Sequence, residues 1–474
     1  MSVVYILSDL GSSSATASYA TVFYGLGNLI MIPLAIPIRN QIGLSKFFAI
    51  TWTLFIFTTF LAGTAPTYPA FIAYRFLQGL ASGPIVSLIN NFLLAVLEPH
   101  EKPNILKSSM LLYIISPILG ASWGGWISYD YNWRYIFLIN VIVMIITGIF
   151  LYIKLKIHTP SIKKIPFDKT AFAAYVLMLS SLIIFLTLGQ ELDWFRCKSI
   201  TFSFYSFLAA LSFFIIRTIY HSNPILAFDL LKKPLISFSL INLGVLFAIY
   251  FGMTLLLSIW LTLYVRFTVI WVATILGVMV FSAALLMHVT RKYLQTHKVW
   301  IPLGLAIISL SFSCFYSSNF NVDINLGRIA FSRIIAGISF ALFLPSLFHL
   351  LICNLSSEDA PRAFGLFQVT RSLASALGTT IFYTIWIRRQ VFYYERLGGN
   401  LTKFSPITDR FFIRAKEFGL SNAQIEPQLD EFLQNQATSL ALNDCFYLMG
   451  WITALLFILY LVSYTQKKAI HYVG

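Results

Sequence analysis

Long apolar segments recur along the whole chain of 474 residues, and they decide which kind of fold it can adopt. Each has about the 20 residues that a helix needs to cross a hydrocarbon core roughly 30 Å thick. Only 11% of the residues are charged, whereas a soluble domain carries about a quarter. The sequence therefore predicts an all-α integral membrane protein with about thirteen spans. We place them at 16–38, 44–65, 68–97, 105–128, 134–153, 170–189, 200–219, 235–257, 267–289, 299–316, 326–353, 364–387 and 442–464.

The same composition excludes several other classes of protein. The net charge is +15, but the basic residues lie between apolar blocks rather than on one face, so the charge does not predict nucleic-acid binding. The four cysteines, Cys197, Cys314, Cys353 and Cys445, lack the spacing of a metal site or a disulfide framework. No phosphate-binding GxxxxGKS or GxxxxGKT loop and no catalytic constellation occurs in the sequence. We therefore expect neither an enzyme nor a bound metal or cofactor.

Lysine and arginine in the loops predict the orientation, because short cytoplasmic loops carry an excess of both. The loops at 39–46, 98–107, 154–169, 217–233, 291–298 and 354–362, with the tail after residue 464, hold 18, whereas the short loops opposite hold five. We therefore expect the C-terminus in the cytoplasm and a polar stretch at 388–441 outside, with helical periodicity near 409–420. Thirteen spans place Met1 outside. Residues 1–15 are too short to span and lack the basic start of a signal peptide, so we expect that a helix is missing before Met1, either because translation begins upstream or because the gene is truncated.

Two spans carry the same short pattern, Arg-x-x-x-Gly with a proline downstream. It occurs at Arg75 and Gly79, and again at Arg333 and Gly337. Parallel repeats of this kind are typical of secondary transporters built from two helical halves. An arginine in hydrocarbon is costly and marks function by default, although a structural arginine that binds backbone carbonyls is the alternative. Both interpretations stay open for Arg75, for Arg333 and for Arg371, which lies within the 364–387 span.

The acidic residues all fall in loops or at the ends of spans. No carboxylate is therefore expected in mid-membrane, where proton-driven transporters usually need a group that changes its charge. Small residues at Gly120, Gly124 and Gly125, and again between residues 365 and 378, are spaced so that two helices can approach closely.

Several motifs, in the same order along the chain, resemble one family. They are residues 75–84 (Arg-Phe-Leu-Gln-Gly-Leu-Ala-Ser-Gly-Pro), the glycines at 120–125, residues 131–140, residues 189–195, residues 370–373 with Gly378, and Asn443 with Asp444. The chain resembles the major facilitator superfamily, specifically its fourteen-helix drug:proton antiporters of the EmrB/QacA type, and most closely the EmrB-like branch. It departs from the family pattern at Ala121, where the antiporter motif has a proline, and in the loop at 36–43, which keeps only Gly43.

The resemblance implies a major facilitator fold with two six-helix pseudo-repeats and two inserted helices. Residues 1–153 would form the N-terminal half, 154–233 the linker and the inserted helices, and 234–474 the C-terminal half with a periplasmic loop at about 388–441. Residues 3–11 resemble the end of the family's first helix, whose carboxylate then has no counterpart in this sequence.

The resemblance also implies a function: efflux of amphipathic hydrophobic compounds in exchange for protons, by a multi-pass protein of the bacterial inner membrane. Arg75 would tune the protonation of a carboxylate, Gln78 would support it, and Gly79, Gly120, Gly124 and Gly125 would let the fourth and fifth helices approach. Arg333 and Arg371 are further candidates for coupling. Polar residues in lipid are costly, so the candidates for the transport cavity are Asn28, Ser87, Asn90, Asn91, Tyr113, Asn242 and Gln368.

Two alternatives remain open at this point. The chain could export one specific metabolite, such as a siderophore or a fatty acid, or it could be a truncated remnant or structural subunit that transports nothing. The expected partners are the lipid bilayer, small hydrophobic substrates and protons. A periplasmic adaptor protein and an outer-membrane channel are implied by the resemblance, with the 388–441 stretch as the contact.

Overall fold

The computed structural model describes residues 3–13, 16–96, 120, 123–157, 168–220, 225–294, 299–352, 355, 359–401 and 405–473, and no strand occurs among them. Its helices are α1 (Val3–Asp9), α2 (Tyr19–Met31), α3 (Ala35–Ile42), α4 (Leu44–Gly63), α5 (Tyr68–Val96), α7 (Trp133–Ile157), α8 (Lys169–Leu188), η2 (Trp194–Arg196), α9 (Lys198–Tyr220), η3 (Phe228–Lys232), α10 (Pro234–Leu263), α11 (Val269–Leu294), α12 (Trp300–Ser317), α13 (Leu326–Ile352), α14 (Asp359–Gly398), α15 (Pro406–Glu417) and α16 (Asn422–Val473).

Nine helices in the described part of the chain are long and apolar enough to cross a membrane. Their outer faces are apolar too: α7 exposes Ile142, Ile146, Phe150 and Ile153, a surface suited to lipid rather than water. A helix satisfies its own backbone hydrogen bonds, as a span in hydrocarbon must. The predicted all-α integral membrane fold is confirmed.

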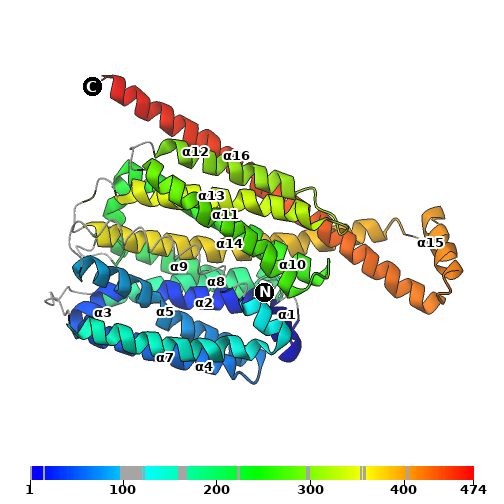
Figure 1. Ribbon diagram of the computed structural model, residues 1–474, viewed down its shortest axis with the longest axis horizontal. Coiled ribbons are helices and arrows are strands. Elements are labelled where there is room, and N and C mark those ends of the chain that lie inside the picture. The colour runs from blue at the N-terminus through cyan, green and yellow to red at the C-terminus, as the bar shows by residue number, and fades with distance from the viewer. Residues whose placement is uncertain are drawn as a thin grey trace.

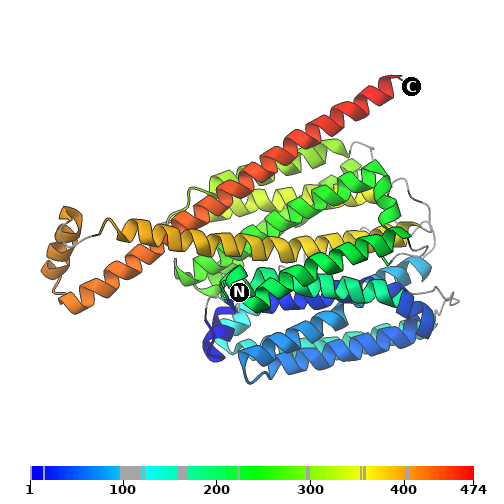
Figure 2. The same cartoon turned by 180° about the vertical axis from the view of Figure 1, so that it is seen from behind.

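Two groups of helices pack in the same order. In the first group α2 packs on α5, α5 on α4 and α4 on α7; in the second, α11 packs on α13, α13 on α12 and α12 on α16. The Arg-x-x-x-Gly patterns lie on the equivalent helices α5 and α13. The pair α8 and α9 pack on each other, and α8 contacts both α2 and α14. This pair therefore lies beside the junction of the two groups (Figures 1 and 2).

The first expected span, at 16–38, is not one continuous helix. α2 ends at Met31 and α3 begins at Ala35, and between them the Leu34 N–H donates to the Met31 carbonyl over 3.2 Å. Pro33 has no N–H to donate, and its ring crowds the preceding turn, so the chain bends at this point.

The stretch at 388–441 is largely helical rather than a loop. α14 has 40 residues and α16 has 52, which at 1.5 Å per residue makes them about 60 Å and 78 Å long, well beyond a ~30 Å core. The C-terminal end of α14 and the N-terminal end of α16 project from the bundle, and α15 lies at the tip of this projection (Figure 1). α15 covers most of the segment in which the sequence predicts helical periodicity. α14 contains no glycine or proline between Arg388 and Gly398, so it has no helix-breaking residue at the membrane surface.

Candidate functional site

Arg75 lies on α5 and is held by uncharged groups from α2 and α5. Its Nη1 donates to Gln78 Oε1 at 2.5 Å, and its Nε donates to the Ala20 carbonyl at 3.4 Å. The guanidinium carbon lies 4.4 Å from the centre of the Tyr24 ring, a cation–π contact. Gln78 is buried and its Nε2 donates to Thr59 Oγ1 of α4 at 2.7 Å. Among the described residues no carboxylate contacts Arg75.

Glycines allow α2 and α5 to cross in direct backbone contact beside this cluster. A Cβ on Gly79 would lie 2.1 Å from the Tyr24 carbonyl oxygen, and one on Gly27 would lie 2.2 Å from the Phe76 carbonyl oxygen. Distances this short leave no room for any side chain at either position. Gly79 was expected to bring the fourth and fifth family helices together; among the described residues it contacts α2.

Arg333 occupies the equivalent position on α13 and is completely buried. Its Nη2 donates to Ser317 Oγ at 3.0 Å and to Ser332 Oγ at 2.9 Å, and lies 3.4 Å from Met253 Sδ. Its Nε and Nη1 have no hydrogen-bond partner among the described residues. This positive charge is therefore compensated only in part, in surroundings where a charge is costly.

The glycine of the second pattern has the same packing role as the first. A Cβ on Gly337 would lie 1.8 Å from the Met279 carbonyl oxygen and 2.2 Å from Ser282 Oγ, both on α11. The internal repeat seen in the sequence thus corresponds to two equivalent helix crossings, each with a buried or half-buried arginine one turn before the glycine.

Arg371 and Gln368 lie together on α14, with Arg371 Nε donating to Gln368 Oε1 at 3.0 Å. The Arg371 guanidinium carbon is 5.9 Å from the Phe247 ring centre on α10. The next residue, Ser372, has its Oγ 3.5 Å from Asn28 Oδ1 on α2. This contact joins α14, which packs on α16 of the second group, to α2 of the first.

An aromatic cluster beside Arg371 was not predicted from the sequence. Tyr250 stacks on Phe340 with ring centres 4.6 Å apart, and Phe247 stacks on Phe251 at 5.5 Å. Phe247, Tyr250 and Phe251 share one face of α10 through their spacing of three and four residues. That spacing is the sequence feature from which the cluster could have been predicted. Because the chain has 44 phenylalanines, the spacing alone does not distinguish this site from other aromatic pairs.

The remaining predicted residues are dispersed. Asn28 Nδ2 donates to Ser82 Oγ at 3.0 Å, and Asn242 is buried with its Oδ1 unpartnered among the described residues. Gly124 is buried, whereas Gly120 is exposed and a Cβ there would meet nothing within 4 Å. Tyr113 and the side chains of Ser87, Asn90 and Asn91 lie outside the described residues.

Gly125 contacts a helix of the other group rather than α5. A Cβ on it would lie 3.1 Å from Ala273 Cβ and 3.2 Å from Val269 Cγ1, both on α11. This is a second contact between the two groups of helices, at the end of α11 opposite its basic Lys292. Gly125 therefore lies against α11, whereas most of the expected fifth helix, at 105–128, lies outside the described residues.

A large cavity of about 1650 Å³ lies between the α8–α9 pair and the helices α10 and α14. Its walls are mainly apolar, and its charged residues, Asp168, Asp229, Lys232 and Arg362, lie at the ends of these elements. Arg75, Arg333 and Arg371 are not among the residues that line it. In the described part of the chain no group of three or more His, Cys, Asp or Glu side chains is placed to hold a metal ion.

Asp168 caps α8 at this charged end. Its Oδ1 accepts from the N–H groups of Thr170 and Ala171, each at 3.1 Å, and its Oδ2 accepts from Arg217 Nε at 2.8 Å. Burial alone raises the pKa of Asp168, but the hydrogen bonds from Arg217, Thr170 and Ala171 outweigh burial and hold the pKa well below its usual range. The carboxylate thus ties α8 to α9.

Comparison with known proteins agrees with this architecture. A profile of the Major Facilitator Superfamily matches residues 1–379. The multidrug export protein EmrB of Haemophilus influenzae is 24% identical over 96% of this chain and 89% of its own length. The fatty acid resistance protein FarB of Neisseria gonorrhoeae is 23% identical over 94% of this chain and 88% of its own length.

The solved structure of the human organic anion transporter MFSD10 (TETRAN) shares the fold at 11% identity, with a TM-score of 0.61 over 97% of this chain and 88% of that chain. The resemblance to EmrB-like proteins found in the sequence motifs is confirmed. Because the superfamily profile covers well over half of the chain and the two groups of helices repeat one packing order, the chain belongs to the Major Facilitator Superfamily and is a multi-pass membrane transporter rather than an enzyme.

Proposed function

We propose that this transporter exports amphipathic, hydrophobic compounds from the bacterial cytoplasm or inner leaflet in exchange for protons. The names of its relatives, a multidrug export protein and a fatty acid resistance protein, support export of apolar and amphipathic compounds. The observation that carries the proposal is Arg75, a positive charge within a span whose described partners are all neutral. Such a charge lowers the proton affinity of any carboxylate brought near it.

In this proposal Arg75 acts as the coupling charge and Gln78 positions it through the 2.5 Å hydrogen bond. Gly79 keeps α5 against α2 so that Arg75 stays at one depth. Arg333 and Arg371 are the corresponding charges in the second group of helices. The aromatic cluster on α10 and α13 offers apolar and cation–π contacts to an amphipathic substrate.

Rocking of the two groups of helices would give alternating access. Contacts between the groups include Gly125 against α11, Gly25 against Ala376 and Asn28 against Ser372. We place the charged end of the large cavity, and with it the C-terminus, in the cytoplasm, because the basic loops lie at that end.

The coupling role of Arg75 is tested in inside-out membrane vesicles. Addition of a lipophilic cation should release protons from vesicles that contain the wild-type protein, and Arg75→Ala should abolish this release. Arg75→Lys keeps the charge and should retain part of it. Arg196→Ala removes an exposed arginine in η2 and serves as the matched control. Proton release by Arg75→Ala at the wild-type rate would show that Arg75 is not the coupling charge.

Export of a specific metabolite is the second candidate, and the FarB relative favours a fatty acid. A susceptibility panel with equal numbers of cationic drugs and long-chain fatty acids separates the two. Protection against fatty acids alone would establish the narrower function, whereas protection against chemically unrelated drugs would establish multidrug export.

The projection formed by the ends of α14 and α16 with α15 is the proposed contact for a periplasmic adaptor. It exposes large apolar side chains at Ile413, Phe418 and Phe432, which is typical of a surface that binds a partner. Deletion of residues 400–436 should abolish adaptor co-purification and leave membrane insertion intact. Co-purification that survives the deletion would place the contact elsewhere.

A further inference from the structure

The large cavity lies outside the arginine clusters and has its own chemical character. Its volume of about 1650 Å³ exceeds the roughly 300–1,000 Å³ of ordinary small-molecule sites. Phe214 and Ile215 of α9 line it, as do Leu366 and Val369 of α14 and Tyr175 of α8. Tyr175 uses its hydroxyl to bond the Leu29 carbonyl at 3.0 Å, so its ring presents an apolar surface. The walls therefore suit hydrocarbon chains.

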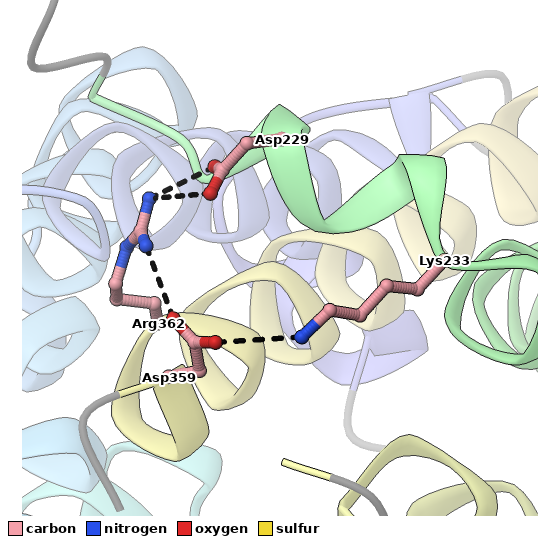
Figure 3. Close-up of polar contacts among 4 residues, drawn as sticks. All are labelled: Asp229, Lys233, Asp359 and Arg362. Carbon is pink, nitrogen blue, oxygen red and sulfur yellow. Dashed lines mark hydrogen bonds and ion pairs between the residues drawn. The ribbon is translucent and has the colours of Figure 1, made fainter. Parts of the chain in front are cut away.

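One end of this cavity is charged and carries an excess of basic groups. The described residues within 168–169, 217–233 and 359–362 hold five lysines and arginines against three aspartates, a net charge of +2. Figure 3 shows the part of this end around Arg362, whose Nη2 donates to both oxygens of Asp229 at 2.8 and 3.0 Å. Asp359 is shared between Arg362 at 3.2 Å and Lys233 at 3.4 Å (Figure 3).

Of the two basic residues that line the cavity, Arg362 and Lys232, it is Lys232 that forms no ion pair with any described residue. Arg362 and Lys233 pair with the aspartates of Figure 3, and Arg217 pairs with Asp168. Lys232 lines the cavity and is exposed, and it forms no ion pair with any described residue. A mainly apolar cavity thus has in its lining an ammonium group that no described carboxylate neutralises.

We propose that the cavity binds an anionic phospholipid of the surrounding leaflet. Its acyl chains lie between α9 and α14, and its phosphate lies at Lys232. Basic pockets between membrane helices are the sites at which anionic headgroups bind, and the net charge of +2 at the charged end favours them over zwitterionic headgroups. The bound lipid joins the α8–α9 pair to α10 and α14, so it is a structural ligand and not the exported substrate.

The test is native mass spectrometry of the full-length protein released from mild detergent with phosphatidylglycerol or phosphatidylcholine added. Phosphatidylglycerol should bind more tightly. Lys232→Glu reverses one exposed charge and should weaken phosphatidylglycerol binding about 30-fold, with phosphatidylcholine unaffected. Gly365→Phe places a ring inside the cavity, since a Cβ at Gly365 meets nothing within 4 Å and Gly365 lines it, and it should weaken the binding of both lipids.

Two variants serve as matched controls. Lys292→Glu makes the same charge change in the last turn of α11, away from the cavity, and Ala209→Phe adds the same ring to the exposed face of α9. Both should bind lipid as the wild type does.

Unchanged phosphatidylglycerol binding in Lys232→Glu or Gly365→Phe would overturn the proposal. So would equal binding of the two lipids by the wild type, or displacement of phosphatidylglycerol by oleate at lower concentration, which would identify a free fatty acid as the occupant. Lipid binding is measured in an assay that does not depend on transport. A wild-type protein that binds phosphatidylglycerol but releases no protons would therefore contradict the proposed function and leave the lipid site intact.

Discussion

Substituting Gly337 by alanine tests whether the close crossing of α11 and α13 is required for the fold. The added Cβ would lie 1.8 Å from the Met279 carbonyl oxygen and 2.2 Å from Ser282 Oγ. Carbon and oxygen atoms approach comfortably only to about 3.3–3.6 Å, so the two helices would have to separate by more than about 1 Å. The movement would also break the 3.1 Å hydrogen bond from Ser282 Oγ to the Ile334 carbonyl.

The expected cost follows from these contacts. Overpacking a well-packed site costs about 1–3 kcal/mol, and a lost interhelical hydrogen bond adds roughly 0.6 kcal/mol. Alanine recovers up to about 1 kcal/mol through its higher helix propensity. We therefore expect Gly337→Ala to destabilise the protein by about 1–3 kcal/mol. Gly79→Ala should behave alike, because its Cβ would lie 2.1 Å from the Tyr24 carbonyl oxygen.

Gly365→Ala is the matched control, because its Cβ meets nothing within 4 Å. It should leave stability unchanged or raise it by up to about 1 kcal/mol. The assay is the apparent melting temperature of the three variants and the wild type in one detergent, followed by size-exclusion chromatography. If the melting temperature of Gly337→Ala equals that of Gly365→Ala instead of lying well below it, the close contact between α11 and α13 does not constrain the fold.

Two further substitutions separate structural from functional roles. Arg333→Met should raise the free energy of unfolding by about 1–4 kcal/mol, because it removes a buried charge with two donors that lack partners among the described residues. Transport by this variant should fall. A melting temperature below that of the wild type would show that Arg333 has a structural role instead. Asp168→Asn should keep the helix cap and lose the pair with Arg217, whereas Asp168→Ala should lose both and cost about 1 kcal/mol more. The folded-state pKa of Asp168 lies below its unfolded value, so its contribution is complete above the unfolded pKa and is lost only as the pH falls through the folded one. Melting temperatures measured between pH 5 and 8 should therefore show a constant difference between Asp168→Ala and the wild type, and a difference that disappears at pH 5 would contradict this account.

Much of the fold could be predicted because a bilayer imposes simple rules on sequence. Segments of about 20 apolar residues must be helical, and the long apolar helices found in the structure follow from this. The repeated Arg-x-x-x-Gly pattern predicted two equivalent halves, and the structure places both patterns at equivalent helix crossings. Boundaries were less predictable: Pro33 divides the first span, and α14 continues far beyond the membrane because its polar end contains no glycine or proline before Gly398.

The candidate site was predictable only in part, because sequence gives the depth of a residue and not its neighbours. The arginines at 75, 333 and 371 are apparent in the sequence as charges within spans. Their partners are not, since Arg333 meets Ser317 and Met253 from two other helices. The aromatic cluster on α10 and α13 escaped prediction for the same reason.

The sequence by itself determined that this chain is helical, that it lies in a membrane, and that it carries two similar halves with charges inside them. These properties depend on hydrophobicity and spacing, which are local to each segment. Only the tertiary structure decided which glycines face which helices, which arginine donors are left without partners, and where the α8–α9 pair encloses a cavity. Those properties depend on contacts between segments far apart in the chain, and packing in a bilayer selects such contacts by shape rather than by hydrophobicity.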